Sequence, residues 1–382
     1  MDHRARILAA IRHEPVDRVP TDIWATPEVQ QKLCAHFGID LGPTATSSGP
    51  ALCGGALARD MEATLALFDR LGVDGILNIA PPYIGPPLRK EGDYHENEWG
   101  MGFRSQAYGT GTYDEQVHYP LADAETIADL EACCWPDPDW YDYGALPALA
   151  ALCGRRAICC GYTAIFYYHN LLRGLELSLM DPILRPEFTH YLVRRISGFF
   201  GEYHRRSFEA GRGWVDITQV TDDFGSQHGL LISPSVFKEF YRDSIQRAID
   251  LAKSDGLLVF HHDDGDMRRL LPVLTEMGIE VLNPIQWRCG NWDLAALKAE
   301  YGSRLCFHGA VDNQHTLPFG TPGDVRAEVK RLIGTLASDG TGFIIGPCHN
   351  LQPVTPIENI VALYEAALEY GSVDSSGPLR VG

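Results

Sequence analysis

Short apolar runs alternate with amphipathic segments along most of the chain. We identify eight such runs, and each ends in glycine, proline or polar residues. They cover residues 18–25, 73–80, 157–166, 214–223, 257–265, 280–287, 305–313 and 342–350. Runs of this length and composition predict β-strands.

The segments between the runs have the period of amphipathic helices. In PSVFKEFYRDSIQRAIDLAK, Ser233 is the expected N-cap and Pro234 the first helical residue. Gly278 and Gly340 stand where two later helices are expected to end. Repeated strand–helix units predict an α/β fold, and eight units favour a single-domain (β/α)8 TIM barrel over residues 1–382. An open doubly wound sheet is less favoured because its glycine-rich turn does not follow the first run.

Two stretches, residues 26–70 and 81–150, are longer than ordinary barrel connections. The second combines aromatic, glycine and turn residues, which predicts a hairpin followed by a short helix. It is an enlarged loop after the second strand, on the side where barrel loops build active sites. We therefore expect 81–150 to be an inserted active-site wall, with a neutral decoration or an oligomer contact as alternatives.

Composition narrows the class of protein. The 382 residues carry a formal net charge of −18, which argues against nucleic acid and anionic membrane surfaces as partners. The ten cysteines show no C-x-x-C spacing and are expected to be reduced thiols. No apolar run reaches the length of a membrane span, and the charged start lacks the pattern of an export signal. These features predict a cytoplasmic protein, and the sequence leaves open whether it forms a homodimer.

The strongest chemical motif is the HHDDG sequence at the end of the fifth run. Because side chains alternate along a strand, His262 and Asp264 share one face, and His261 and Asp263 share the other. A His-x-Asp pair supplies two metal ligands or an acid–base pair. The alternative is structural, with Asp264 as a helix N-cap and His262 simply hydrogen-bonded.

The last run ends in GPCHN, which supplies His349. In a closed barrel the strand ends converge on one axis, so His349 is expected to meet His262 and Asp264. These three residues are the predicted metal ligands. Cys348 is a less favoured ligand, because an adjacent residue does not easily point the same way, and an inert buried thiol is the usual alternative.

The fourth run ends in TDDFGSQ. Asp222 and Asp223 are therefore candidates to hold a cation, orient a histidine or take a proton, although one of them could simply cap a loop. Other polar and aromatic residues near strand ends suggest a broad mouth for a bulky or flat ligand. These candidate substrate-binding residues are Trp24, Asn78, Tyr162, Gln227, Asn283, Gln286 and Asp312, with His308 as a further weak mark.

Longer stretches resemble the uroporphyrinogen decarboxylase-like superfamily across nearly the whole chain. They are RILAAIRHEPVDRVPTDIWA, TDDFGSQHGLLISPSVFKEFYRDSIQRAIDLAK, HHDDGDMRRLLPVLTEMGIEVLNPIQ, FHGAVDNQHTLPFGTP and CHNLQPVTPIENI. The resemblance implies the same barrel. The decarboxylases carry an M-R-Q-A-G-R segment after the first strand, where this chain has W-A-T-P-E-V, and an acid near the position of Asn78. Only His349, in a stretch similar to the family's G-H-G segment, is retained from that constellation.

The other branch of the superfamily comprises corrinoid-dependent methyltransferases. Their zinc is bound by an H-x-C-G segment after strand five and a cysteine after strand eight. Here His262-Asp263-Asp264-Gly265 and His349 occupy the matching places, so the resemblance implies zinc or a harder metal held by nitrogen and oxygen. The segments GDYHENEWGMGFRSQ and PLADAETIADLEACCWPDPD are also more similar to this branch.

The resemblance therefore favours a methyltransferase. Such proteins move a methyl group between a small methylated substrate and a corrinoid (cobalamin) carried by a partner protein, as O-demethylase components do. A uroporphyrinogen decarboxylase-like carboxy-lyase that uses Asp222, Asp223 or His349 is the first alternative. A noncatalytic ligand-binding barrel is the second.

Overall fold

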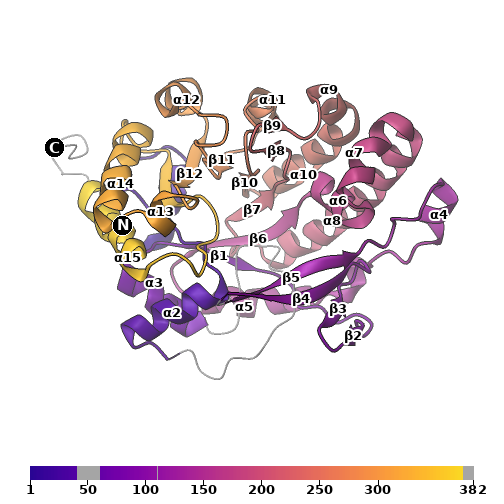
Figure 1. The fold of residues 1–382 in the computed structure, drawn as a ribbon, viewed down its shortest axis with the longest axis horizontal. Coiled ribbons are helices and arrows are strands. Elements are labelled where there is room, and N and C mark those ends of the chain that lie inside the picture. Colours follow the sequence, from indigo (N-terminus) through magenta and orange to yellow (C-terminus); the bar gives the residue numbers. More distant parts are fainter. Residues whose placement is uncertain (41–60, 110, 373–382) are drawn as a thin grey trace.

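A parallel seven-stranded sheet forms the centre of the molecule (Figure 1). The computed structural model describes residues 1–40, 61–109 and 111–372. The strands, in spatial order, are β1 (Ile76–Ile79), β6 (Ala157–Thr163), β7 (Ile217–Val220), β10 (Leu258–His262), β11 (Val281–Asn283), β12 (Cys306–Val311) and β13 (Phe343–Pro347). Each lies within one of the eight predicted runs, so seven predicted strands are confirmed in sequence order.

The first predicted run, residues 18–25, forms isolated bridges instead of a strand. Thr21 pairs with Ile345 in parallel, and Ala25 pairs with Leu351. The Ile345 N–H donates to Pro20 O on one side, and the Gly75 N–H donates to Thr21 O on the other. This segment therefore lies between β13 and the residues that precede β1, at the two open edges of the curved sheet.

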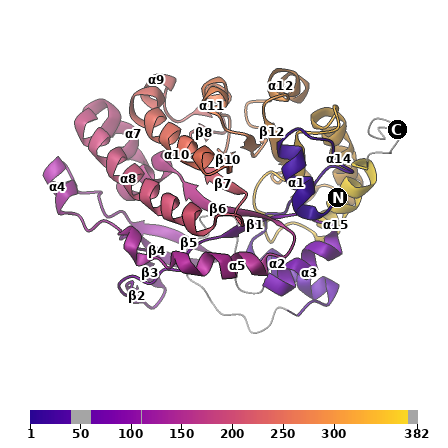
Figure 2. The ribbon, with the colours of Figure 1, turned by 180° about the vertical axis from the view of Figure 1, so that it is seen from behind.

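Alternation along the strands separates an inner face from an outer face. Leu258 and Phe260 of β10 belong to a core cluster with Ile76, Ile217 and Ile344 of other strands, together with Ala157, Cys159, Val281 and Cys306. Residues of α1 (His3–Ile11) complete this cluster, and α1 contacts β6 and β13. Figure 2 shows α1 from behind. The inner face of the curved sheet is thus a packed apolar core that α1 covers at the amino ends of the strands.

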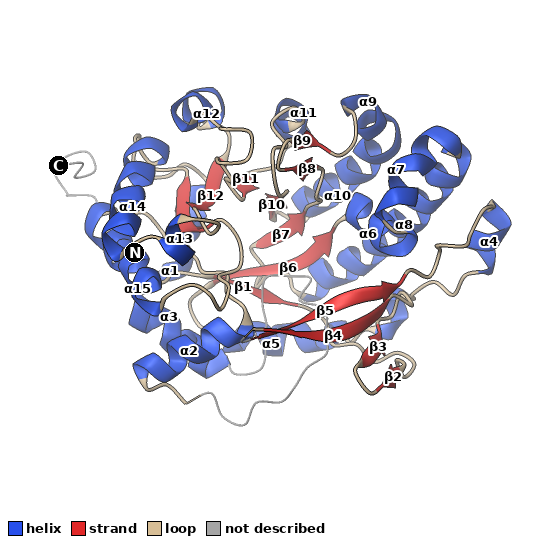
Figure 3. Cartoon of the chain, viewed as in Figure 1, coloured by secondary structure: helices blue, strands red, loops and turns tan. Residues whose placement is uncertain are grey.

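The large helices cover the outer face of the sheet (Figure 3). They are α2 (Pro27–Phe37), α3 (Met61–Leu71), α6 (Ile165–Arg173), α7 (Leu175–Leu184), α8 (Pro186–Ala210), α10 (Arg242–Ser254), α11 (Leu271–Met277), α12 (Leu294–Tyr301), α14 (Pro322–Leu336) and α15 (Ile357–Tyr370). The short elements α9 (Pro234–Val236), η3 (Phe237–Tyr241) and α13 (Thr316–Phe319) lie between them. This alternation is the α/β arrangement that the sequence predicts.

Two of the three expected helix boundaries agree with the structure. Ser233 accepts a hydrogen bond from the Val236 N–H and Pro234 is the first residue of α9. Gly278 ends α11 in the left-handed conformation, with φ 104°. The prediction for Gly340 is wrong: α14 ends at Leu336, and Gly340 follows in a turn with φ 83°.

The long segment after β1 forms a second, antiparallel sheet. Its strands are β2 (Lys90–Glu91), β3 (Tyr94–Glu96), β4 (Gly102–Tyr108) and β5 (Gly111–His118), paired in that order. The short helix α4 (Ile127–Ala132) follows, then η1 (Pro138–Trp140), η2 (Tyr143–Ala145) and α5 (Leu146–Leu152). The segment therefore contains the expected hairpin, β4–β5, extended by two further strands, and the expected short helix. In the stretch 26–70, residues 41–60 lie outside the described part.

The described cysteines form no disulfide among themselves. None of the helices in residues 1–40, 61–109 and 111–372 combines the length and apolar composition needed to cross a bilayer.

Candidate active site and metal site

The candidate site lies where the carboxyl ends of β10 and β13 approach each other. His262 is the last residue of β10, and alternation from Leu258 and Phe260 turns it toward the inner face of the sheet. Asp264 follows two residues later. His349 lies two residues beyond the end of β13. Strand ends that are distant in sequence therefore deliver the three residues to one place, as the sequence predicts from barrel geometry.

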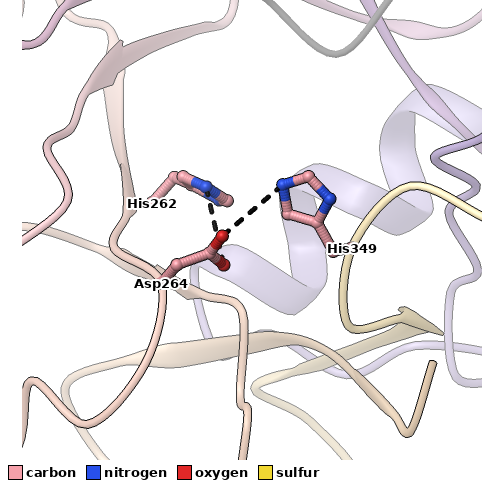
Figure 4. A group of neighbouring side chains, drawn as sticks. All are labelled: His262, Asp264 and His349. Carbon is pink, nitrogen blue, oxygen red and sulfur yellow. Dashed lines mark ion pairs between the residues drawn. The ribbon is translucent and has the colours of Figure 1, made fainter. Parts of the chain in front are cut away.

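Asp264 bridges the two histidines (Figure 4). Its Oδ1 lies 3.8 Å from His262 Nε2, and its Oδ2 lies 3.6 Å from His349 Nε2. One ligand atom from each of the three residues lies within 4.8 Å of the others. The side chain of His262 is 12% exposed, and those of Asp264 and His349 are 39% and 34% exposed. Two imidazoles and a carboxylate thus converge at a point that solutes can reach.

Asn283 and Trp24 fix the orientation of the His262 ring. Its Nδ1 lies 2.6 Å from Asn283 Oδ1, and its ring stands against the indole of Trp24 with centroids 5.4 Å apart. Burial lowers the pKa of His262, but the attraction of Asp264 and Asp223 and the Asn283 hydrogen bond together outweigh it, so the pKa lies above its usual value. The imidazole is therefore fixed in orientation, and its Nε2 faces the carboxylates.

Asp264 is held by its neighbours. Gln286 donates through Nε2 to Asp264 Oδ1 at 2.7 Å, and the Asp264 N–H donates to Asp223 Oδ1 at 3.3 Å. Asp223 also lies 3.9 Å from His262 Nε2, and burial together with the charge of Asp264 raises its pKa. Asp223 therefore borders the site, with a pKa above that of an ordinary aspartate.

His349 differs from His262 because it stands on a loop. Burial and the nearby His262 lower the pKa of His349, although Asp264 acts in the opposite direction. The rings of the two histidines have centroids 5.6 Å apart. A neutral His349 presents a nitrogen lone pair, which suits either metal binding or proton transfer.

Two glycines allow the loops after β7 and β10 to touch. A Cβ at Gly265, where φ is 81°, would meet the Ser226 backbone oxygen at 2.5 Å. A Cβ at Gly225 would collide with the Asp264 carbonyl oxygen. The glycines of the DDFG and HDDG motifs are thus needed for close backbone contact, which fixes the loop that carries Asp264.

A pocket of about 410 Å³ opens in front of Asp264 and His349. Its other lining residues are Gly225, Ser226, Gln227, Gly265, Gln286, Asn313, Gln314, Asn350 and Gln352. Six of the lining side chains are carboxamides and none belongs to lysine or arginine. None of these residues comes from 81–150, so the pocket wall is built from the loops after β7, β10, β11, β12 and β13.

Several candidate residues lie elsewhere. Asp222 is buried and accepts hydrogen bonds from the N–H groups of Phe166 and Tyr167 at 3.1 and 2.7 Å, so it fixes the start of α6. Asp312 is buried, accepts from the Gln314 and Thr316 N–H groups and pairs with Arg288 at 2.6 Å. Asp222 thus serves the backbone, as the capping alternative proposed for one of the two acids after the fourth run. Asp312 holds its own loop and the side chain of Arg288.

The remaining candidate residues differ in whether they reach the pocket. Asn283 is fully buried, its amide oxygen and nitrogen each contact a histidine, and it is not among the pocket-lining residues. Cys348 is buried, and its thiol donates to Ile285 O instead of joining the three ligand atoms. Asn78 and Tyr162 are half-buried and are not among the pocket-lining residues. Of the candidate substrate-binding residues, Gln227 and Gln286 line the pocket, and Trp24 backs His262.

The sequence analysis missed Asp22 and gave His308 little weight. His308 Nε2 lies 2.9 Å from Asp22 Oδ2, and His308 Nδ1 lies 2.7 Å from Asn283 Nδ2. The signal was available in part: His308 follows Cys306 by two residues on β12, so alternation turns both toward the inner face. The rim residues Asn313, Gln314, Asn350 and Gln352 carried no comparable signal.

Comparison with known proteins adds to this geometry. A uroporphyrinogen decarboxylase of Legionella pneumophila subsp. pneumophila (strain Philadelphia 1) is 24% identical over 388 residues, covering 96% of this chain and 97% of the relative. The methylcobamide:CoM methyltransferase MtaA of Methanosarcina barkeri is 29% identical over 168 residues, covering 44% of this chain and 45% of the relative. For that relative and one of the decarboxylases, the match spans half or less of the relative's length.

The solved structure of a methyltransferase from Methanosarcina mazei has the same fold, with a TM-score of 0.64 at 20% identity, covering 97% of this chain and 99% of that one. The family model described as uroporphyrinogen decarboxylase (URO-D) matches residues 143–370, which is more than half of the chain. Together with the parallel sheet and the site at its carboxyl edge, this match shows that the chain belongs to the uroporphyrinogen decarboxylase family.

Proposed function

We propose that this protein is a metal-containing methyltransferase that moves a methyl group between a small methylated substrate and a corrinoid carried by a partner protein. One observation carries the proposal: ligand atoms of His262, Asp264 and His349 lie within 4.8 Å of one another, and Asp264 and His349 line an open pocket. The MtaA relative, a methylcobamide:CoM methyltransferase, supports the reaction class.

The three residues fit a zinc ion by type and by spacing. Zinc takes nitrogen and oxygen ligands at about 2.0–2.1 Å, which places two tetrahedral donors about 3.3 Å apart. The separations of 3.8 and 3.6 Å from Asp264 to the two histidines are somewhat longer than that value, and all three ligand atoms lie within 4.8 Å of one another. His262, Asp264 and His349 would hold the ion, which would supply Lewis acidity to a methylated oxygen, nitrogen or sulfur of the substrate.

The protein's own groups would manage the proton and the position of the substrate. Asp223 lies 3.9 Å from His262 Nε2, and its raised pKa suits a group that exchanges a proton with the heteroatom as the methyl group leaves or arrives. Gln227 and Gln286 offer amide groups at the pocket wall. A rim of carboxamides without lysine or arginine favours an uncharged methylated substrate, because it offers hydrogen bonds and no counter-charge to an anion.

The finer architecture follows from the same contacts. We propose a single-domain (β/α)8 barrel in which residues 18–25 take the first strand position between β13 and β1. The antiparallel sheet of 81–150 stands after β1 and, since it does not line the pocket, is proposed to border the wider approach of the partner. We favour a role as an O-demethylase component, whose substrate carries its methyl group on oxygen.

Decarboxylation of a tetrapyrrole is the second candidate. It is favoured by the Legionella relative, which matches over 96% of this chain, whereas MtaA matches over 44%. The pocket argues against it, because a polycarboxylate substrate would meet Asp264 and no lysine or arginine among the lining residues.

The decisive experiment measures metal and methyl transfer on one preparation. We expect about one equivalent of zinc per chain in the purified protein. His262→Ala and His349→Ala should lose it, whereas His228→Ala, an exposed histidine beside Gln227, should keep it. The zinc-loaded protein is then screened with methylcobalamin and cob(I)alamin against methoxyaromatic, methylamine and thiol substrates, following the corrinoid absorbance.

Two results would overturn the proposal. The first is silence of the metal-loaded protein across the whole screen. The second is metal-independent release of coproporphyrinogen from uroporphyrinogen, which would establish the decarboxylase instead.

A further inference from the structure

A continuous row of hydrogen bonds leads from His262 into the interior. His262 Nδ1 lies 2.6 Å from Asn283 Oδ1, and Asn283 Nδ2 lies 2.7 Å from His308 Nδ1. His308 Nε2 lies 2.9 Å from Asp22 Oδ2. Asn283, His308 and Asp22 are each at most 1% exposed. The row therefore has one end at the candidate metal site and the other at a buried carboxylate.

Neighbouring strands hold the members of the row in place. His262 and Asn283 are register partners on β10 and β11, and His308 stands on the adjoining β12. Asp22 lies in the segment between β13 and β1, where its Oδ1 accepts the Ile76 N–H at 3.1 Å and its Oδ2 accepts the Trp24 indole N–H at 3.2 Å. The carboxylate is thus tied to the sheet and cannot turn away from His308.

The direction of every hydrogen bond follows from the carboxylate. Both carboxyl oxygens of Asp22 already accept N–H groups, from Ile76 and Trp24, so Asp22 also accepts from His308 Nε2. With its single proton on Nε2, the imidazole of His308 has its lone pair on Nδ1. Asn283 must then donate through Nδ2, which turns Oδ1 toward His262. Because an amide oxygen only accepts, His262 Nδ1 carries the proton. The opposite orientation of the amide would face two acceptors toward each other at Asp22.

We propose that Asp22, His308 and Asn283 are positioning residues that hold His262 as the Nδ1–H tautomer, so that its Nε2 lone pair faces Asp264 and His349. The consequence for a metal rests on the proposed function: a pre-set lone pair avoids the cost of exchanging tautomers on binding, and the hydrogen bond strengthens His262 as a ligand. The tautomer itself is a property of the metal-free chain.

The first test reads the tautomers directly. In metal-free full-length protein with ¹⁵N-labelled histidine, long-range ¹H–¹⁵N correlation spectra distinguish a protonated ring nitrogen from one with a lone pair. They are recorded at alkaline pH, where His262 is neutral despite its raised pKa. His262→Gln and His308→Gln identify the two signals. We expect a proton on Nδ1 of His262 and on Nε2 of His308. A proton on Nε2 of His262 would overturn the proposal.

The second test breaks the row in its middle. Asn283→Ala removes both amide contacts and should weaken zinc binding about 10–100-fold, the usual cost of losing the partner that orients a ligand. Asn283→Asp keeps an oxygen that accepts from His262, so it should retain more zinc affinity than Asn283→Ala. The matched control is Asn359→Ala, which removes an equally buried amide that donates to Leu317 O and Gly320 O. Equal zinc affinity in Asn283→Ala and the control would contradict the proposal.

The two proposals fail in different ways. If the tautomers are as expected and zinc does not bind to any protein tested, the row of hydrogen bonds stands and the metal function falls. If zinc binds with one equivalent and metal-free His262 carries its proton on Nε2, the metal function stands and the positioning role falls. The spectra of the wild-type protein decide the latter even if an Asn283 variant does not fold.

Discussion

Gln286 Nε2 donates a hydrogen bond to Asp264 Oδ1 at 2.7 Å. The Oε1 atom of the same Gln286 side chain accepts the Gly265 N–H at 2.7 Å. A single amide therefore forms hydrogen bonds with both the carboxyl group of Asp264 and the peptide that follows it. Because Asp264 stands between His262 and His349, its orientation decides whether the three ligand atoms converge.

Replacement of Gln286 should therefore weaken metal binding without removing a ligand. Gln286→Met keeps the approximate size of the side chain and loses both hydrogen bonds. We expect zinc affinity to fall about 10–100-fold, as for other partners that orient a ligand. Competition with a chromophoric chelator measures the affinity, and Gln314→Met, an exposed amide on the same rim, is the control. An unchanged affinity in Gln286→Met would show that Asp264 needs no such support.

The sequence predicted the strands well because each lies in a short, mostly apolar run that turn or polar residues bound. The run at 18–25 is the exception: Pro20 cannot donate to a ladder, and the segment contacts its neighbours through isolated bridges. The placement of His262, Asp264 and His349 was also predictable, since it needed only strand alternation and the convergence of strand ends. Their role as metal ligands stays a prediction.

The sequence could not predict how deeply each inward-facing residue is buried within the curved sheet. Alternation turns Asn283 and His308 inward, but how far each lies from the mouth depends on the stagger between strands, which no local pattern encodes. Asn283 was therefore expected at a substrate, and it lies buried between two histidines. Asp22 escaped notice because its partner, His308, is 286 positions away.

The role of Asp222 can be separated from catalysis. Its carboxyl group is buried and accepts from the first N–H groups of α6, at Phe166 and Tyr167. Asp222→Ala should lower the free energy of unfolding by about 1–3 kcal/mol, because two buried donors lose their acceptor. Zinc affinity of the folded protein should stay unchanged. Urea denaturation and zinc titration of the same sample check this. A lower zinc affinity with an unchanged free energy of unfolding would instead indicate that Asp222 takes part in the metal site.

Asp74 is expected to be critical for closing the sheet at the amino ends of its strands. Its carboxyl group is fully buried and pairs with Arg18 at 2.8 Å and with Arg6 of α1. It also accepts the Thr21 N–H at 3.1 Å, next to the segment that lies between β13 and β1. Asp74→Asn should cost about 3–5 kcal/mol of unfolding free energy, since it leaves the largely buried guanidinium of Arg18 without its counter-charge and leaves Arg6 with Asp17 alone.

The control for Asp74 is Asp255→Asn, which removes the partner of the well-exposed Arg212. Such a surface pair contributes at most about 1 kcal/mol, so this variant should unfold near the wild-type urea concentration. Similar destabilisation by both variants would mean that the buried cluster adds nothing beyond an ordinary ion pair.

Acid should destabilise the fold through His204, a buried histidine of α8 that is not among the pocket-lining residues. Its Nε2 accepts the Tyr162 N–H at 2.9 Å, so Nδ1 carries the proton and donates to Thr163 Oγ1 at 3.0 Å. Burial lowers the pKa of His204 from 6.5 to about 3. The unfolded chain therefore binds a proton between these two values that the folded chain does not, and stability falls as the pH falls below 6.5.

The size of this effect follows from linkage, at about 1.4 kcal/mol per pH unit within the window. Between pH 7.5 and pH 5, His204 should remove about 2 kcal/mol of unfolding free energy. His204→Gln cannot take up a proton, and its amide oxygen can still accept the Tyr162 N–H, so its loss over the same range should be smaller by that amount. His36→Gln, at an exposed histidine of α2, should retain the full wild-type loss. Parallel losses in all three proteins would show that His204 is protonated in the folded state and that its burial does not exclude the charge.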